Sequence, residues 1–472
     1  MGLFPSNLAH GQPSAGPAWQ TFDLTLAPGT RTEIAGPFYY HQATDSETTW
    51  AWPPFYSRYV NPGIESREDD FLYPLCTYVS YGREYRWQFA ELFNFGGGAR
   101  PEQGDARRFT IYPFYFQQRS TNASEDYTAL VPFYGHIKDR LLIHDVYFVM
   151  FPLYFESRNK GVVTDNYLFP IFARSQGDHL SGWKFWPLMG EEHKDITHAT
   201  NGFGDVTLVP GHEKSFAFWP IYYESLTGLG TDNPERADGI FPIYGEARSP
   251  QRDATYWVWP FFSWIDERQK KYHEWQGPWP FVIFTRGEGK HTSRIWPLFS
   301  QSHNATQESD SYLWPAYQYR GFHTDLVETK RRKVFFYLYE SWEERDLKRG
   351  TVKKRLDMWP FFTWHQDVHG STRLQIFAPV EPALNEQRGI ERNWSPLWSL
   401  WRAENNATNG HQSRSLLWNF YRSDTTPATK KSSLLFGLFQ YMQAGETNRL
   451  RCFYGLDFNL HKPVKPVNLS AK

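Results

Sequence analysis

The chain has 472 residues, with 50 Lys plus Arg against 51 Asp plus Glu and a formal net charge of −1. This balance leaves no polybasic surface, so nucleic acid is not an expected partner. No stretch approaches the roughly twenty apolar residues of a membrane-spanning helix, and residues 1–6 lack the basic start and apolar core of a signal peptide.

A five-residue word returns about twenty-two times along the chain, at intervals of about nineteen residues. It consists of an aliphatic residue, Trp or Phe, Pro, then Leu, Ile or Phe, and finally Tyr or Phe. Clear copies are Val258-Trp259-Pro260-Phe261-Phe262, Ile295-Trp296-Pro297-Leu298-Phe299 and Met358-Trp359-Pro360-Phe361-Phe362. The repeat divides the chain into an N-terminal tether and lead-in over residues 1–33, a continuous β-repeat domain over residues 34–458 and a C-terminal tail over residues 459–472.

The composition of the repeat is typical of β-structure. Apolar runs rich in aromatic and β-branched residues are separated by clusters of Gly, Asn, Asp and Ser, which indicates strands and turns. Connections this short cannot carry a parallel crossover, so successive strands are expected to pair antiparallel. The sequence therefore predicts an all-β fold: a single large antiparallel meander of about 22 strands, barrel-like or coiled into a two-layer sheet.

The Pro of the word is predicted to lie in the middle of each strand, at a β-bulge, because a regular central strand tolerates Pro badly. A bulge shifts the alternation of side chains by one residue. The aliphatic residues of the word would then share one face of the sheet, and the aromatic residues the other.

Many antiparallel strands with short turns resemble, by periodicity only, the pattern of bacterial outer-membrane β-barrels. The aromatic-Pro words also resemble those of bacterial envelope proteins, a resemblance that identifies no activity. It implies a location in the bacterial cell envelope, in association with the outer membrane. Against a spanning barrel, the apolar word covers at most about 20 Å, and its aromatic residues lie at the centre of the band rather than at its two ends.

Two groups of polar residues are candidates for a catalytic or a metal site. Carboxylates recur after the word at Glu156, Glu224, Glu246 and Asp266; paired carboxylates beside Trp-rich clefts can hydrolyse glycosides, but acids that recur with a repeat favour a structural role. The histidines around His193, His198 and His212 lack the spacing of a known zinc pattern, so no metal, cofactor or catalytic residue is expected.

The two cysteines, Cys76 and Cys452, lie in an early and in the last strand of the array. Separate buried thiols are the favoured interpretation, and a disulfide stays open.

Aromatic residues make up 18% of the chain, including 21 Trp, more than a core of this size requires. The surplus favours a non-enzymatic protein that binds a lipid or other apolar ligand, or a structural scaffold. The ligand-binding residues are predicted on the aromatic strand face: Tyr154, Tyr222, Phe262, Phe299, Tyr317 and Phe362. An outer-membrane pore and a carbohydrate-binding or carbohydrate-active protein are the alternatives; the ligand's identity and the oligomeric state stay open.

Overall fold

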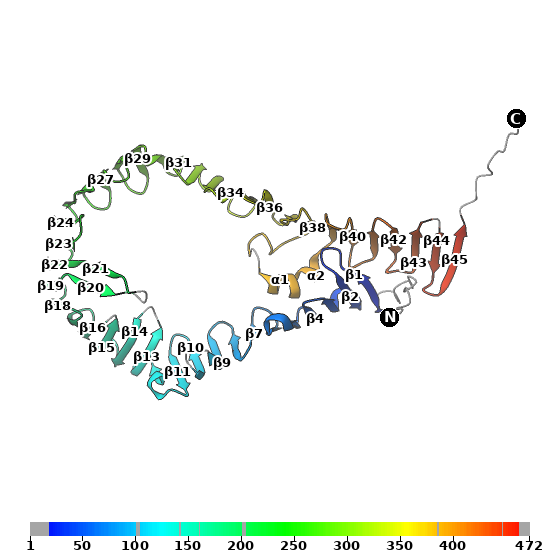
Figure 1. Ribbon diagram of the computed structural model, residues 1–472, viewed down its shortest axis with the longest axis horizontal. Coiled ribbons are helices and arrows are strands. Elements are labelled where there is room, and N and C mark those ends of the chain that lie inside the picture. The colour runs from blue at the N-terminus through cyan, green and yellow to red at the C-terminus, as the bar shows by residue number, and fades with distance from the viewer. Residues whose placement is uncertain are drawn as a thin grey trace. The chain divides into compact units, whose positions relative to one another are not determined.

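The computed structural model describes residues 18–100, 104–140, 143–159, 161–200, 204–384, 387–445 and 447–461. These residues form 45 strands, of which 43 belong to antiparallel sheet while β20 and β21 form a separate two-stranded sheet (Figure 1). The all-β, antiparallel prediction is confirmed. The chain divides into two compact units: unit 1 comprises Met1–Ala90 and Thr324–Lys472, and unit 2 comprises Glu91–His323.

Unit 1 contains two runs of strands, two short α-helices and two 3₁₀ turns. Its elements are β1 Gln20–Asp23, β2 Gly29–Ile34, η2 Gly36–Phe38, β3 Tyr39–Thr44, β4 Thr48–Trp52, β5 Tyr56–Asn61, η3 Pro62–Ile64, β6 Ser66–Phe71, β7 Cys76–Tyr81, β8 Glu84–Phe89, β34 Val327–Val334, β35 Tyr339–Asp346, β36 Thr351–Met358, β37 Phe362–Gln366, β38 Thr372–Ile376, α1 Arg388–Asn393, α2 Ser395–Trp398, β39 Trp401–Asn405, β40 Gln412–Leu416, β41 Tyr421–Thr425, β42 Thr429–Leu434, β43 Phe439–Ala444, β44 Thr447–Cys452 and β45 Leu456–His461.

Unit 2 is a run of 25 strands with one 3₁₀ turn. Its elements are β9 Phe93–Arg100, β10 Gly104–Ile111, β11 Tyr115–Ser120, η4 Ala123–Glu125, β12 Tyr127–Leu130, β13 Tyr134–Arg140, β14 Ile143–Val149, β15 Tyr154–Asn159, β16 Val162–Tyr167, β17 Phe172–Gly177, β18 Leu180–Phe185, β19 Met189–Lys194, β20 Thr197–Thr200, β21 Val206–Val209, β22 Gly211–Ala217, β23 Tyr222–Leu229, β24 Glu235–Ile240, β25 Tyr244–Arg248, β26 Arg252–Trp257, β27 Phe262–Glu267, β28 Tyr272–Gln276, β29 Val282–Gly287, β30 Lys290–Ile295, β31 Phe299–Asn304, β32 Gln307–Tyr312 and β33 Tyr317–His323.

The strand count of about 22 is wrong, because each repeat is a hairpin of two strands rather than one strand and a turn. Strands β26 and β27 flank the word at residues 258–261, which forms the turn between them. The Trp259–Pro260 peptide bond is cis, and the Phe261 N–H donates to the Val258 carbonyl at 2.9 Å. This is the arrangement of a type VI turn, so Pro lies outside the ladder and the predicted mid-strand bulge is also wrong.

Successive Pro turns are hydrogen-bonded to one another. The backbone N–H of Trp259 donates to the backbone carbonyl of Pro242, one repeat earlier, at 2.7 Å. In the same way the Trp219 N–H donates to Pro187 at 2.6 Å and the Phe169 N–H to Pro152 at 2.8 Å. The turns therefore continue the ladder along one edge of the sheet, called the turn edge from here on.

Turns without Pro adopt a different backbone. Leu435 and Phe436 have φ of 53° and 55°, and Phe335 and Phe336 have φ of 44° and 63°. Two consecutive residues with positive φ are the mark of a type I′ hairpin turn. The same word is thus accommodated by two turn types, and in both it stays at the tip of a hairpin.

The strand array extends into the predicted lead-in, since β1 begins at Gln20. Residues 1–17 of the predicted tether and residues 462–472 of the predicted tail lie outside the described residues. Among the described strands, β1 and β45 are not paired with each other, and barrel-like closure is not confirmed.

The register gives the sheet two distinct faces. Face A carries the first strand residue after each Pro turn, and face B carries the second. In unit 2, direct pairing on face A aligns Tyr154, Tyr167 and Phe172, while pairing on face B aligns Phe155, Asn166 and Ala173. The second to fourth residues of the word lie in the turn and the fifth begins the next strand, so the predicted split into an aliphatic and an aromatic face is wrong.

Face B contains the buried residues of unit 2. One core cluster consists of Phe116, Tyr127, Ala129, Ile137 and Phe148. A second consists of Ala247, Ala254 and Ile265, with Ala237 and Tyr256 packed against it. Aromatic residues before Pro fold over this face at several turns. Phe151 packs 5.7 Å from Phe155 and Trp219 5.8 Å from Phe216, measured between ring centroids.

In unit 1, α1 joins the N-terminal strands to the C-terminal run. Arg392 of α1 pairs with Asp70 at 2.5 Å and Glu68 at 2.6 Å, and its Nε donates to the Ser57 hydroxyl at 3.1 Å. Asn393 also donates to Asp70, at 2.7 Å. Arg392 and Asp70 are buried, so breaking this pair would leave an uncompensated charge inside the protein.

Candidate functional site

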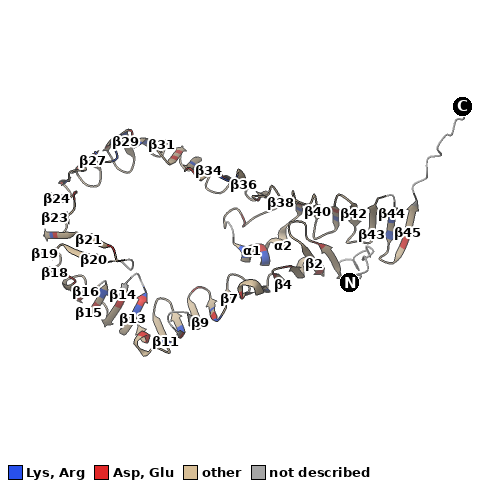
Figure 2. Cartoon of the chain, in the orientation of Figure 1, with Lys and Arg blue, Asp and Glu red and all other residues tan. Residues whose placement is uncertain are grey.

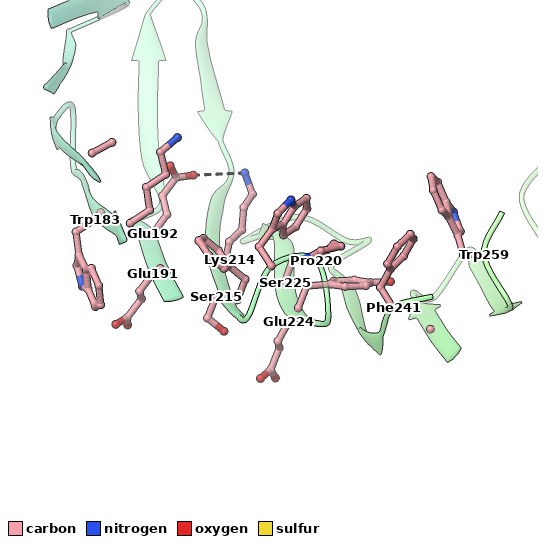
Figure 3. A pocket seen from close by; sticks show the side chains of 18 of the residues that line it. Trp183, Glu191, Glu192, Lys214, Ser215, Pro220, Glu224, Ser225, Phe241 and Trp259 are labelled. Atoms are coloured by element: carbon pink, nitrogen blue, oxygen red, sulfur yellow. Dashed lines mark hydrogen bonds and ion pairs between the residues drawn. The ribbon is translucent and has the colours of Figure 1, made fainter. Parts of the chain in front are cut away.

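Unit 2 has an apolar groove on face B, shown from close by in Figure 3. The groove has a volume of about 580 Å³ and crosses strands β17–β19 and β22–β26. It lies beside the turn edge, because the pre-proline residues of three successive Pro turns contribute to its wall. They are Trp219, Phe241 and Trp259.

The aromatic wall is built from two layers. Tyr223 is the second residue of β23, and Phe216 and Tyr256 are the second-to-last residues of β22 and β26. All three lie one position in from the turn edge and point to face B. The pre-proline rings pack against this layer or against each other, with Phe241 and Trp259 at 5.1 Å between centroids. Trp219 and Trp259 remain 47% and 51% exposed, so both rings present apolar surface to a ligand.

Small residues form the floor of the groove. Ala173 is buried, and Gly190 and Gly245 lie in register positions next to aromatic residues. A Cβ at Gly190 would come within 2.4 Å of Phe216 Cε1, and one at Gly245 within 2.8 Å of the Tyr223 hydroxyl oxygen. Glycine at these positions lets the rings lie across the neighbouring strand, and the space above the floor stays open.

Polar side chains lie at the other end of the groove. Glu192 accepts from His212 Nε2 at 2.8 Å and pairs with Lys214 Nζ at 3.4 Å. Burial acts to raise the pKa of the Glu192 carboxyl, but the hydrogen bond from His212 and the charge of Lys214 outweigh burial, so its pKa lies below its ordinary value. Figure 3 shows Glu191 and Glu224 projecting to the opposite side of the sheet from Glu192 and Lys214.

The six predicted ligand-binding residues occupy one equivalent position: each is the first residue of the strand after its turn. They begin β15, β23, β27, β31, β33 and β37 and therefore lie on face A. Tyr154 packs against Tyr167 at 5.2 Å, and Tyr317 against Tyr312 at 6.0 Å. Tyr222 and Phe262 are more than 40% exposed.

None of these six residues lines the groove. The groove instead uses aromatic residues before Pro and aromatic residues one position in from the turn edge, on the other face. Once the word is placed in a turn, period-2 alternation assigns Tyr222 to face A and Tyr223 to face B. This alternation could have located the groove residues from the sequence. The predicted bulge shifted the alternation by one residue and so assigned the side chains to the wrong face.

The four carboxylates considered as a catalytic pair are distributed along face A. Glu224 and Glu246 lie in register on either side of Asp238. Glu224 pairs with Arg236 at 3.0 Å and Glu246 with Arg248 at 3.3 Å. Glu156 pairs separately with Arg158 at 2.5 Å, and Asp266 with His273 at 3.0 Å.

The histidines and cysteines are placed apart. His193 Nε2 lies 3.1 Å from Asp195 Oδ1, while His212 contacts Glu192 on the neighbouring strand. Among the described residues, no group of three or more His, Cys, Asp or Glu side chains could hold a metal ion. Cys76 in β7 and Cys452 in β44 are both free thiols, and burial raises the pKa of Cys76.

Charged residues of both signs are interspersed along the strands (Figure 2). The described part of the chain contains no helix with the length and apolar character required to cross a membrane. Neither a scan against protein-family models nor a search of curated proteins finds a match to this chain.

Proposed function

We propose that this protein is a non-enzymatic β-repeat protein that binds a lipid or another elongated apolar ligand in the face B groove. The observation that carries the proposal is the groove itself, about 580 Å³ in volume and lined by three pre-proline aromatic rings, of which Trp219 and Trp259 are about half-exposed. Ligand pockets are concave and mostly apolar, with few polar groups. Burial of apolar ligand surface against the rings supplies the binding free energy.

Replacement of one wall residue tests this function. Trp259→Ala removes an exposed ring from the groove, so we expect binding of dodecanol, measured by isothermal titration calorimetry, to weaken about tenfold or more, since burial of one large apolar side chain is worth roughly 1.5–3 kcal/mol. Trp296→Ala is the matched control, because Trp296 holds the same pre-proline position but packs between Phe281 and Trp314 outside the groove. Failure of the unmodified protein to bind dodecanol, or an equal loss in both variants, would contradict the proposal.

A second candidate function, association with a membrane surface, is favoured by the turn edge. The residues after Pro expose large apolar side chains there, including Ile221 at 53%, Ile243 at 66% and Phe361 at 60%. Tyr occupies the next position along several strands, as at Tyr154, Tyr222 and Tyr244, and Trp52 and Trp257 end strands just before a tip. Apolar tips followed by Trp and Tyr match the order of side chains at a membrane interface.

A further inference from the structure

The groove differs in character from one end to the other. Over β22–β26 its wall is aromatic and its floor is small and apolar. Over β17–β19 the lining changes to Ser175, Gly182, Lys184 and Glu192, with Lys214 reaching in from β22. The two ends lie on different strands of the sheet. An elongated ligand that runs perpendicular to the strands would therefore have one end in the apolar region and the other in the polar region.

The polar end carries a cationic excess. Two ammonium groups, those of Lys184 and Lys214, face one carboxylate, that of Glu192, which Lys214 and His212 already contact. Within the described part of the chain, the Lys184 ammonium has no hydrogen-bond or ion-pair partner. Lys184 is half-buried at the second-to-last position of β18, directly across from Gly190 and Ala173 on the groove floor.

The carboxylates on neighbouring positions do not neutralise this excess. Glu191 and Glu224 are part of the strands that line the groove, but the side chains of both residues project from the opposite face, face A (Figure 3). Asp178 pairs with Lys194, at 3.3 Å, outside the groove lining. The free positive charge at the polar end therefore belongs to Lys184.

We propose that the groove binds a single-chain anionic amphiphile, with its carboxylate or phosphate head group at Lys184 and Lys214 and its chain along Tyr223, Tyr256 and Trp259. This proposal rests on the proposed function and specifies the ligand class for the same groove. Six strand-to-strand steps separate β18 from β26. At roughly 4.8 Å a step this is about 29 Å of sheet, long enough for an extended acyl chain.

Calorimetric titration of the full chain tests the proposal, with dodecanoate and dodecyl phosphate below their micelle concentrations and dodecanol below its solubility limit. We expect both anions to bind about tenfold more tightly than dodecanol, because their charged head groups accept charge-assisted hydrogen bonds from the two lysines. Lys184→Gln should remove most of this preference by weakening the binding of both anions far more than that of dodecanol, and Lys184→Arg should restore it. The tighter of the two anions identifies the head group.

Lys270→Gln makes the same charge change in the polar turn between β27 and β28, away from the groove, and should leave all three affinities unchanged. Equal binding of dodecanol and the anions, with no effect of Lys184→Gln, would overturn the anionic head-group site and leave the apolar groove function standing. Absence of binding by all three compounds would overturn both.

Discussion

At the scale of single residues, His365 in β37 illustrates how burial changes chemistry in this protein. Its Nε2 lies 2.9 Å from the Thr363 hydroxyl oxygen, which donates to Asp357 at 2.5 Å. Burial, followed by the positive charges of Arg355 and Arg373, lowers the pKa of His365 to about 4. The imidazole is therefore neutral in the folded protein over a range where an unfolded chain would bind a proton.

This difference predicts a pH dependence of stability. An unfolded histidine has a pKa of about 6.5, so between pH 6.5 and pH 4 the unfolded state binds a proton that the folded state does not, and stability falls as pH falls. We expect His365→Gln to reduce the loss of unfolding free energy between pH 7 and pH 4 by about 2–3 kcal/mol, measured by urea denaturation. His369→Gln, at an exposed turn position after β37, is the control; an unchanged pH profile for His365→Gln would contradict the prediction.

At the scale of elements, the hairpin tips decide which residues the protein presents at its turn edge. The tip residues are apolar because the word occupies the turn, whereas hairpin turns are usually polar. Ile221, Ile243 and Phe261 follow the Pro of three successive tips in unit 2 and are all well exposed. Since they contribute little to the core, their substitution should affect surface interactions more than folding.

The combined change Ile221→Ser, Ile243→Ser and Phe261→Ser tests the turn edge as a membrane-binding element. We expect the unmodified protein to sediment with phospholipid vesicles and the triple variant to lose most of this binding, because three apolar side chains no longer insert into the interface. Unfolding free energy should change by less than about 1 kcal/mol. Val206→Ser, an equally exposed residue of the separate β20–β21 sheet, should leave sedimentation unchanged; a similar loss there, or no vesicle binding at all, contradicts the idea.

At the scale of the whole molecule, the array is a repeat protein whose strands contact their neighbours in sequence. Both apolar core clusters and the complete groove lie within unit 2. Because the stability of such arrays is approximately a sum over neighbouring repeats, unit 2 should not require unit 1 in order to fold.

A fragment of residues 91–323 is therefore expected to fold cooperatively and to bind dodecanoate within about threefold of the full chain's affinity. Circular dichroism during thermal unfolding and calorimetric titration measure the two properties. In the fragment β9 and β33 are edge strands, which invite association between fragments, so the monomer is first isolated by size-exclusion chromatography. A monomer without cooperative unfolding, or one that has lost the ligand, shows that unit 2 depends on the rest of the chain.

The sequence by itself determined the repeat of about nineteen residues, the all-β class and the antiparallel pairing, because period, composition and short connections are local properties. It did not decide whether Pro260 and its equivalents lay in strands or in turns. A bulge and a turn are both compatible with the missing backbone N–H of Pro, and a short apolar segment is more often a strand. Only the tertiary structure, in which the Trp259 N–H donates to Pro242 of the preceding turn, assigned the word to the hairpin tip.

The same decision moved the candidate site. Tyr222 and its five equivalents were identifiable as a row from the sequence, but the groove depends on Trp219, Trp259 and the small residue at Gly190, which meet only when separate repeats are packed side by side. Their proximity follows from strand register. A change of one residue in register reverses the two faces of the sheet, so the groove could be located only after the pairing was known.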